Sequence, residues 1–148
     1  MEFTIGNIRP DSTGFQTLKS ESIASGFNML SRLEDNWLTN KNRFDKPGEK
    51  LLGVLSEGLL VGVCGLNRDP FMINARAGRI RHLYISNQWR RMQAGSLLLS
   101  EVVKDSALWF DFLNTNAPPS AFIFYQRAGF IPFTGSAKVT HRLPLTST

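Results

Sequence analysis

Hydrophobic side chains alternate with polar ones at the start of the chain and then recur at a helical spacing. Residues 2–8 alternate in this way, which predicts a β-strand. Residues 10–12, Pro-Asp-Ser, predict a turn and a helix cap. Across residues 13–37, apolar side chains recur every three to five positions, which predicts two consecutive helices with a break near residues 21–22. Residues 39–50 are polar and contain a Pro-Gly pair, so we expect a loop there.

The middle of the chain predicts a hairpin, a further strand and a helix. Residues 51–55 and 59–66 are apolar runs, and the short segment between them ends in Gly58, which predicts a β-hairpin. Residues 79–86 predict another strand. Residues 94–104 carry leucine and valine at helical spacing among small residues, which predicts a helix.

The last third of the chain predicts a strand, a helix and a closing hairpin. Residues 107–113 are rich in aromatic side chains and predict a strand. The pair Pro118-Pro119 suits the first turn of a helix that ends before Gly129. Residues 130–133 and 138–143 predict a hairpin. The resulting order is β-α-α-β-β-β-α-β-α-β-β, an α/β or α+β layout whose central βαβ unit predicts locally parallel strands.

The composition fits one domain, residues 1–148. Compact domains cluster around about 100–150 residues, and a hydrophobic content of 42% is enough to build a core. No apolar stretch approaches the roughly 20 residues of a membrane-spanning helix, and the first residues do not resemble a secretion signal. The single cysteine, Cys64, excludes an intramolecular disulfide and a multi-cysteine zinc site, so we expect a cytoplasmic protein.

The positive charge is confined to one part of the chain. The net charge is +5, yet residues 70–100 contain no Asp or Glu, and the remainder of the chain is neutral. The arginines of that window are Arg76, Arg79, Arg81, Arg90 and Arg91. Such a segment indicates either a polyanionic partner, a nucleic acid or a phosphorylated small molecule, or a solvated basic face.

A candidate phosphate-binding turn lies inside this basic window. The predicted strand ends, a turn carries Arg90 and Arg91, and a helix begins near Ala94 and Gly95. The first N–H groups of a helix have no intrahelical partner and lie at the positive end of its dipole. Together with two guanidinium groups and small residues that admit close approach, this arrangement favours a bound phosphate.

Two motifs resemble the GNAT family of N-acetyltransferases. Residues 90–95, Arg-Arg-Met-Gln-Ala-Gly, resemble its R/Q-x-x-G-x-G/A signature, with Gln93 where the first glycine is usual. Residues 121–130 resemble its A-x-x-x-Y-x-x-x-G-F element, with Pro118 where asparagine is common. The order of predicted elements matches the family over essentially the whole chain. The resemblance implies a mixed, mostly antiparallel central sheet with a parallel βαβ splay and helices on both faces.

The same resemblance implies acetyl-CoA as the cosubstrate. No pair of His, Cys or Asp residues has the spacing of metal ligands, so we expect no metal. The turn and helix start would hold the pyrophosphate of acetyl-CoA, while the strand before them would pair with the pantetheine arm like an added strand. Asn116, with Asn114 as the alternative, would replace the usual asparagine. The cofactor-binding residues implied are Leu83, Ile85, Arg90, Arg91, Met92, Gln93, Ala94, Gly95, Ser96 and Asn116.

The resemblance assigns Tyr125 as the acid that protonates the departing thiolate. A phenol of pKa about 10 suits a thiolate of pKa about 8.5 when it is held in place. The alternative is a core tyrosine on an aromatic helix beside Phe122 and Phe124.

Attack by an amine requires a base, since a primary ammonium has a pKa near ~10.4. His82 is the titratable base on the predicted strand, and a buried structural histidine is the alternative. Weaker candidates are Glu57, Asp69 and Asp111.

Strict alternation along this strand predicts two faces. Ile80, His82 and Tyr84 would share one face, and Arg81 and Leu83 the other.

The resemblance implies an N-acetyltransferase that acts on a primary amine of a small molecule or peptide. Its acceptor would bind between residues 20–25, residues 38–50 and the C-terminal hairpin, since loops of this kind set specificity. The alternative is a catalytically weak acyl-CoA sensor or nucleic-acid-binding module on the same fold, although nucleic acid is the less favoured partner. Family members often dimerise, so a homodimer is a further expectation.

Overall fold

The computed structural model describes residues 2–146, and within them seven strands form one sheet in the order β1-β2-β3-β4-β5-β7-β6. The order along the chain is the predicted one, with three short 3-10 turns added. The elements are β1 (Phe3–Asn7), α1 (Phe15–Ala24), α2 (Met29–Leu38), β2 (Lys50–Ser56), β3 (Leu59–Arg68), β4 (Ala77–Ile85), η1 (Asn87–Trp89), α3 (Ala94–Val103), η2 (Ser106–Leu108), β5 (Phe112–Thr115), η3 (Pro119–Ala121), α4 (Phe122–Arg127), β6 (Ile131–Pro132) and β7 (His141–Pro144).

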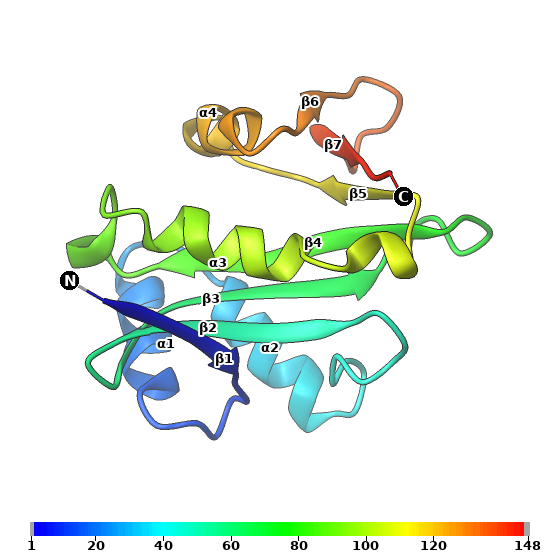
Figure 1. Ribbon diagram of the computed structural model, residues 1–148. Helices are drawn as coiled ribbons and strands as arrows, with labels where there is room; N and C mark the ends of the chain where they lie inside the picture. The colour runs from blue at the N-terminus through cyan, green and yellow to red at the C-terminus, as the bar shows by residue number, and fades with distance from the viewer. Residues whose placement is uncertain (1, 147–148) are drawn as a thin grey trace.

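The sheet is antiparallel except where β4 meets β5. These two strands pair in parallel over three positions, from Ala77 opposite Phe112 to Arg79 opposite Asn114. Beyond Arg79, β4 continues to Ile85 without pairing to β5, and Figure 1 shows the two strands diverging. The predicted βαβ unit is therefore confirmed, and the divergence opens the sheet in its middle.

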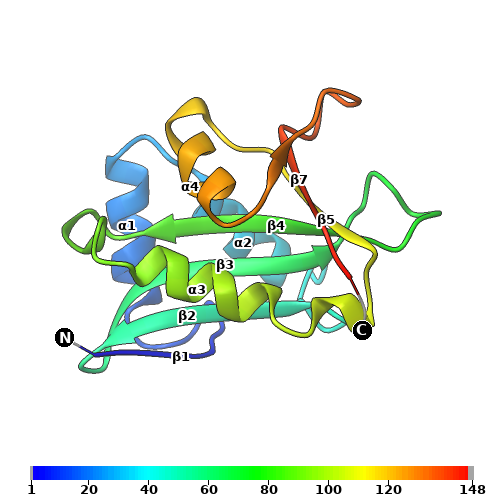
Figure 2. The ribbon, with the colours of Figure 1, turned by 45° about the horizontal axis from the view of Figure 1, so that its top comes forward.

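Helices cover both faces of the sheet. Figure 2 shows α3 in front of the strands and α1 and α2 behind them. Leu98 and Val102 of α3 pack with Tyr125 of α4 in one buried cluster, whereas Leu30 and Leu33 of α2 belong to a second cluster on the other face. Burial of these apolar side chains is the main favourable contribution to folding. The mixed sheet with helices on both faces confirms the predicted fold.

The break between the first two helices lies later than predicted. α1 continues through residues 21–22, and the chain turns at residues 25–28. Gly26 has φ +87°, the left-handed conformation that commonly ends helices, and its N–H donates to the Ile23 carbonyl. Gly26 was the available sequence signal, because glycine adopts this conformation without strain.

The aromatic segment 107–113 is mostly not a strand, and the prediction there was wrong. Residues Ser106–Leu108 form a 3-10 turn, and the N–H groups of Trp109 and Phe110 both donate to the Ser106 carbonyl. Phe110 is buried in the core, so its aromatic ring serves packing between elements and not strand pairing. The strand β5 begins only at Phe112.

A β-bulge in β4 overturns the predicted two faces of this strand. Tyr84 pairs with Val63 and Arg81 pairs with Gly65, so two residues of β4 lie opposite one of β3. The extra residue is His82, whose φ of +61° breaks the alternation. Ile80 consequently packs in the cluster beneath α3, whereas Tyr84 packs in the cluster beneath α1 and α2.

Candidate functional site

A groove of about 1030 Å³ runs between α3 and α4. Its cations are Arg90, Arg91, Lys104 and Arg127, and no Asp or Glu lies among the groove-lining residues that the structure describes. We call this feature the α3–α4 groove. Its charge makes it suited to a polyanion.

The start of α3 forms one end of the groove. Gln93 precedes the helix with φ +69°, and Arg91 has φ +65°, so the turn places two residues in the left-handed conformation. Backbone N–H groups in such turns, and in the first helical turn, form concave anion sites. Arg90 steadies the turn, because its Nε donates to the Ile85 carbonyl at 2.9 Å.

The structure separates the ten predicted cofactor residues into three groups. Those that line the α3–α4 groove are Ile85, Arg90, Arg91, Gln93, Gly95 and Ser96. Leu83 and Asn116 line the neighbouring pocket described below. Met92, which is 43% exposed, and Ala94, which is fully buried, line neither. The side chain of Asn114 is held in a buried network, so Asn116 is the asparagine that faces the pocket.

A second cavity, of about 660 Å³, occupies the opening between β4 and β5. We call it the β4–β5 pocket. It shares Ile85, Arg90, Ser120 and Phe124 with the α3–α4 groove, so the two cavities adjoin at these residues. The groove at the start of α3 and the opening in the middle of the sheet are therefore neighbouring cavities.

Tyr125 projects from α4 into the β4–β5 pocket and is 5% exposed. Its ring meets Phe124 and Phe130 edge-on, with centroids 5.3 and 5.2 Å away. Burial raises the pKa of Tyr125 well above its usual value, and a hydrogen bond with Thr115 offsets only part of this rise. The phenol is therefore protonated at neutral pH and able to donate a hydrogen bond.

His82 lines the same pocket and is 8% exposed. Its ring lies edge-on to Phe44, with 6.1 Å between centroids, and its Nε2 has no hydrogen-bond partner within residues 2–146. Burial, followed by the charges of Arg81 and Arg32, lowers the pKa of His82 to about 3. The ring is therefore neutral at neutral pH, and in this environment it is a much weaker base than an ordinary histidine.

The three weaker base candidates lie outside both cavities. Glu57 lies in the β2–β3 turn, where its φ of +50° and that of Gly58, +83°, are those of a type I′ hairpin. Asp69 forms a buried ion pair with Arg79, and Asp111 forms an exposed one with Arg76.

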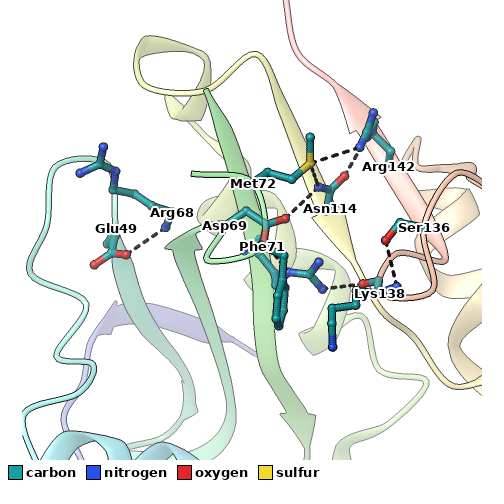
Figure 3. A network of polar contacts seen from close by, with 10 residues as sticks. Glu49, Arg68, Asp69, Phe71, Met72, Asn114, Ser136, Lys138 and Arg142 are labelled. Atoms are coloured by element: carbon teal, nitrogen blue, oxygen red, sulfur yellow. Dashed lines mark hydrogen bonds and ion pairs between the residues drawn. The ribbon is translucent and has the colours of Figure 1, made fainter. Parts of the chain in front are cut away.

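A polar network fixes the loop between β3 and β4 against the C-terminal strands. Asp69 accepts a hydrogen bond from Asn114 of β5 at 2.9 Å, and Arg142 of β7 donates to Asn114 at 2.7 Å. Figure 3 shows this network, with Phe71 and Lys138 beside it. Because Phe71 lines the β4–β5 pocket, the network holds one wall of the pocket in place.

Glu21 of α1 ties the other helix layer to the end of β4. Its carboxylate accepts hydrogen bonds from the Tyr84 hydroxyl, from Ser86 Oγ at 2.7 Å and from the Asn87 N–H at 3.3 Å. Burial acts to raise the pKa of Glu21, but these hydrogen bonds outweigh it and lower the pKa. No local sequence pattern predicts this contact, since it joins residues far apart in the chain.

Three further pocket residues were not predicted: Phe27 from the turn between α1 and α2, and Met29 and Arg32 from α2. Met29 and Arg32 lie three positions apart on α2 and so share one face of the helix. That spacing was the available signal, but it does not say which face of the helix meets the sheet.

Within residues 2–146, no cluster of three or more His, Cys, Asp or Glu side chains is arranged to hold a metal ion. No helix in that range combines the length and apolar character needed to cross a membrane.

Comparisons with known proteins give one family and many similar structures. A family model described as "Acetyltransferase (GNAT) domain" matches residues 16–147. No curated protein matches the chain. A solved structure from Exiguobacterium sp. 255-15, described as an acetyltransferase, is 29% identical with a TM-score of 0.87 and covers 97% of this chain and 94% of its own.

Two more distant structures share the fold. An acetyltransferase of the GNAT family from Staphylococcus aureus Mu50 is 15% identical, with a TM-score of 0.70 and coverage of 98% of this chain and 100% of its own. A ribosomal-protein-alanine N-acetyltransferase from Brucella melitensis is 17% identical, with a TM-score of 0.70 and coverage of 96% and 99%.

Proposed function

The chain belongs to the GNAT acetyltransferase family, and on that premise we propose that it transfers acetyl from acetyl-CoA to a primary amine by direct attack of the amine on the thioester. The observation that carries the proposal is that the two cavities adjoin at the diverging strands. One cavity suits the phosphates of the cosubstrate, and the other offers a buried proton donor where the reacting groups would meet.

The residues of the α3–α4 groove fit coenzyme A. The unpaired N–H groups at the start of α3 and the left-handed turn before it suit a pyrophosphate. The cations Arg91, Lys104 and Arg127 line the rest of the groove and suit further phosphate groups. Bound acetyl-CoA would supply an activated thioester.

The unpaired edge of β4 suits the extended pantetheine arm of acetyl-CoA. From Ile80 to Ile85, the side of β4 that faces β5 pairs with no strand within residues 2–146. Unpaired strand edges bind extended chains through their backbone groups. The carbonyl of Ile85 already accepts a hydrogen bond from Arg90, so the backbone around Leu83 carries most of the expected pairing.

Two side chains of the β4–β5 pocket would act as hydrogen-bond donor and proton acceptor in the reaction. The Tyr125 hydroxyl would donate a hydrogen bond to the departing sulfur, and the unpartnered Nε2 of His82 is the atom available to accept from the attacking amine. Holding both groups in a largely buried site fixes their distance from the reacting atoms, which general acid–base catalysis requires, while the lowered pKa of His82 weakens it as a base.

Titration calorimetry with acetyl-CoA, with ATP as the polyanion control, tests the binding step. We expect saturable 1:1 binding of acetyl-CoA that persists at moderate salt and that ATP does not reproduce, because the strand edge recognises the pantetheine arm. Thiol release with a panel of primary amines then tests transfer. Equal binding of ATP, or no binding of acetyl-CoA, would refute the proposal, whereas binding without thiol release would favour an acyl-CoA sensor.

Gln93→Gly is expected to increase both stability and acetyl-CoA affinity by roughly 1 kcal/mol each. The left-handed backbone conformation of Gln93 is strained for a residue that has a side chain. Glycine removes this strain and also removes the side chain from the turn before α3. Denaturant unfolding and calorimetry measure the two effects. Asp105→Gly is the matched control, since Asp105 has φ +64° but lies outside both cavities. Weaker acetyl-CoA binding by Gln93→Gly would show instead that the glutamine amide contributes to the site.

A further inference from the structure

The β4–β5 pocket carries a cluster of positive side chains at the end away from the α3–α4 groove. Arg79 and Arg81 come from β4, and Arg32 reaches the pocket from α2. No Asp or Glu lies among the pocket-lining residues that the structure describes. Charges in such a partly buried cavity are screened less than charges on an open surface, so the positive potential is concentrated there.

One donor group of the Arg79 guanidinium has no hydrogen-bond partner among the described residues. Arg79 is 5% exposed, its Nε donates to Asp69 at 3.2 Å, and its Nη1 donates to the Lys138 carbonyl at 2.8 Å. Its Nη2 is buried and has no hydrogen-bond partner within residues 2–146. A buried charged donor without an acceptor is costly, so an acceptor atom supplied by a ligand would be strongly favoured.

Asp69 and Glu49 are the carboxylates whose negative charges act on Arg81, but both are hydrogen-bonded to other groups. Asp69 accepts from Arg79 and from two other donors, and Glu49 accepts from a side-chain amide and two backbone N–H groups. No ion pair joins Arg81 or Arg32 to a carboxylate in the part of the chain that the structure describes. Burial, followed by the charges of Arg79 and Arg32, lowers the pKa of Arg81. The cluster therefore holds like charges together without full compensation.

These arginines are poorly placed to serve the phosphates of coenzyme A. Arg81 lies four residues before Ile85, the point where β4 reaches the α3–α4 groove. At about 3.3 Å per residue, and allowing for the bulge, that is roughly 10–13 Å of strand. The groove also has its own cations. The cluster is therefore separate from the groove that suits these phosphates.

We propose that Arg32, Arg79 and Arg81 form an anion subsite for the acceptor, which is a primary amine that also carries a carboxylate or phosphate group. The inference rests on the proposed function and specifies its substrate class. The guanidinium groups would bind the oxyanion through charge-assisted hydrogen bonds, and the amine would then extend toward Tyr125 and His82. Phe27 and Phe71 line the same pocket and would contact the apolar part of the acceptor.

Binding of the oxyanion would also change the electrostatics around His82. After burial, the charges of Arg81 and Arg32 are the next largest causes of its lowered pKa. A negative group between these arginines offsets both charges and makes the imidazole a better proton acceptor. The acceptor would therefore help to activate the residue next to its own amine.

Pairs of amines that differ only in the anionic group test the subsite. β-Alanine is compared with β-alaninamide, and phosphoethanolamine with ethanolamine, as acceptors for the acetyl-CoA-loaded wild-type protein. We expect kcat/KM to be about tenfold or more higher for the anionic member of at least one pair, the effect of one charge-assisted hydrogen bond. The pair with the larger ratio identifies carboxylate or phosphate as the group recognised.

Arg81→Met is expected to remove this preference by raising KM for the anionic amine about tenfold, while acetyl-CoA affinity stays unchanged. Arg32→Met should act in the same direction, and Arg32 is exposed, so its replacement does not threaten folding. Arg76→Met is the matched control, because Arg76 pairs with Asp111 outside the pocket and its loss removes the same charge.

The outcomes separate this proposal from the one on which it rests. Absence of acetyl-CoA binding would refute the proposed function itself. With acetyl-CoA bound, equal use of neutral and anionic amines would overturn the anion subsite alone, as would an equal effect of Arg76→Met and Arg81→Met. If no amine in the panel reacts, β-alanine and phosphoethanolamine are titrated into the CoA-saturated protein, and no saturable binding at millimolar concentration also overturns it.

Discussion

Tyr125→Phe is expected to lower the turnover number about 100-fold or more while acetyl-CoA affinity stays within about twofold. The ring contacts with Phe124 and Phe130 survive the substitution, so the pocket keeps its shape. Only the hydroxyl is lost, and with it the proton donor for the departing sulfur. Steady-state thiol release measures turnover, and calorimetry measures affinity.

The raised pKa of Tyr125 defines how the hydroxyl would act. Burial keeps the phenol protonated, so the donor is present throughout the neutral pH range. A thiolate of pKa about 8.5 is a weaker base than such a phenolate, so complete proton transfer would be uphill. We therefore expect Tyr125 to stabilise the leaving sulfur by a hydrogen bond, an interaction that strengthens as negative charge develops.

Tyr84→Phe is the matched control for this prediction. Tyr84 lines the same pocket, but its hydroxyl donates to Glu21 and not to the space where the reacting groups would meet. Its loss should reduce stability and have a much smaller effect on turnover. Unchanged turnover in Tyr125→Phe, or an equal loss in both variants, would exclude Tyr125 as the donor.

Asp69→Ala is expected to destabilise the protein by about 3–5 kcal/mol, the usual result of removing one partner from a buried ion pair. The Asp69 side chain is 0% exposed and that of Arg79 is 6% exposed, so the guanidinium would remain buried without its counter-charge. Asn114 and the Phe71 N–H would lose an acceptor as well. Denaturant unfolding, with midpoint and slope both recorded, measures the change.

The exposed pair of Arg76 and Asp111 provides the comparison. Their side chains are 57% and 67% exposed, so Asp111→Ala should cost less than about 1 kcal/mol. Adding Arg79→Met to Asp69→Ala should recover part of the stability, because the uncompensated buried charge is then gone. A loss in Asp69→Ala no larger than that in Asp111→Ala would show that the buried pair is not a main support of the β3–β4 loop.

The basic window, residues 70–100, shows how much of a binding site a local sequence pattern can predict. Its five arginines form one cluster in the sequence, and the absence of acidic residues left two interpretations, a polyanionic partner or a solvated basic face. In the structure they have three destinations, since Arg90 and Arg91 reach the α3–α4 groove, Arg79 and Arg81 reach the β4–β5 pocket, and Arg76 pairs with Asp111. The length of β4 separates Arg79 and Arg81 from Arg90 and Arg91, which follow the strand, whereas Arg76 precedes the strand and pairs with Asp111.

Local patterns in the sequence determined the order of elements, the β2–β3 hairpin, the parallel βαβ unit and the turn before α3. Each depends on residues close together in the chain, such as Gly58 in its turn or Gly95 at its helix start, so periodicity and turn chemistry are sufficient. Only the tertiary structure decided the bulge at His82, the burial of Asp69 with Arg79, and the approach of Arg32 to the pocket. These depend on contacts between distant segments, whose packing fixes strand register, exposure and the local electrostatic environment.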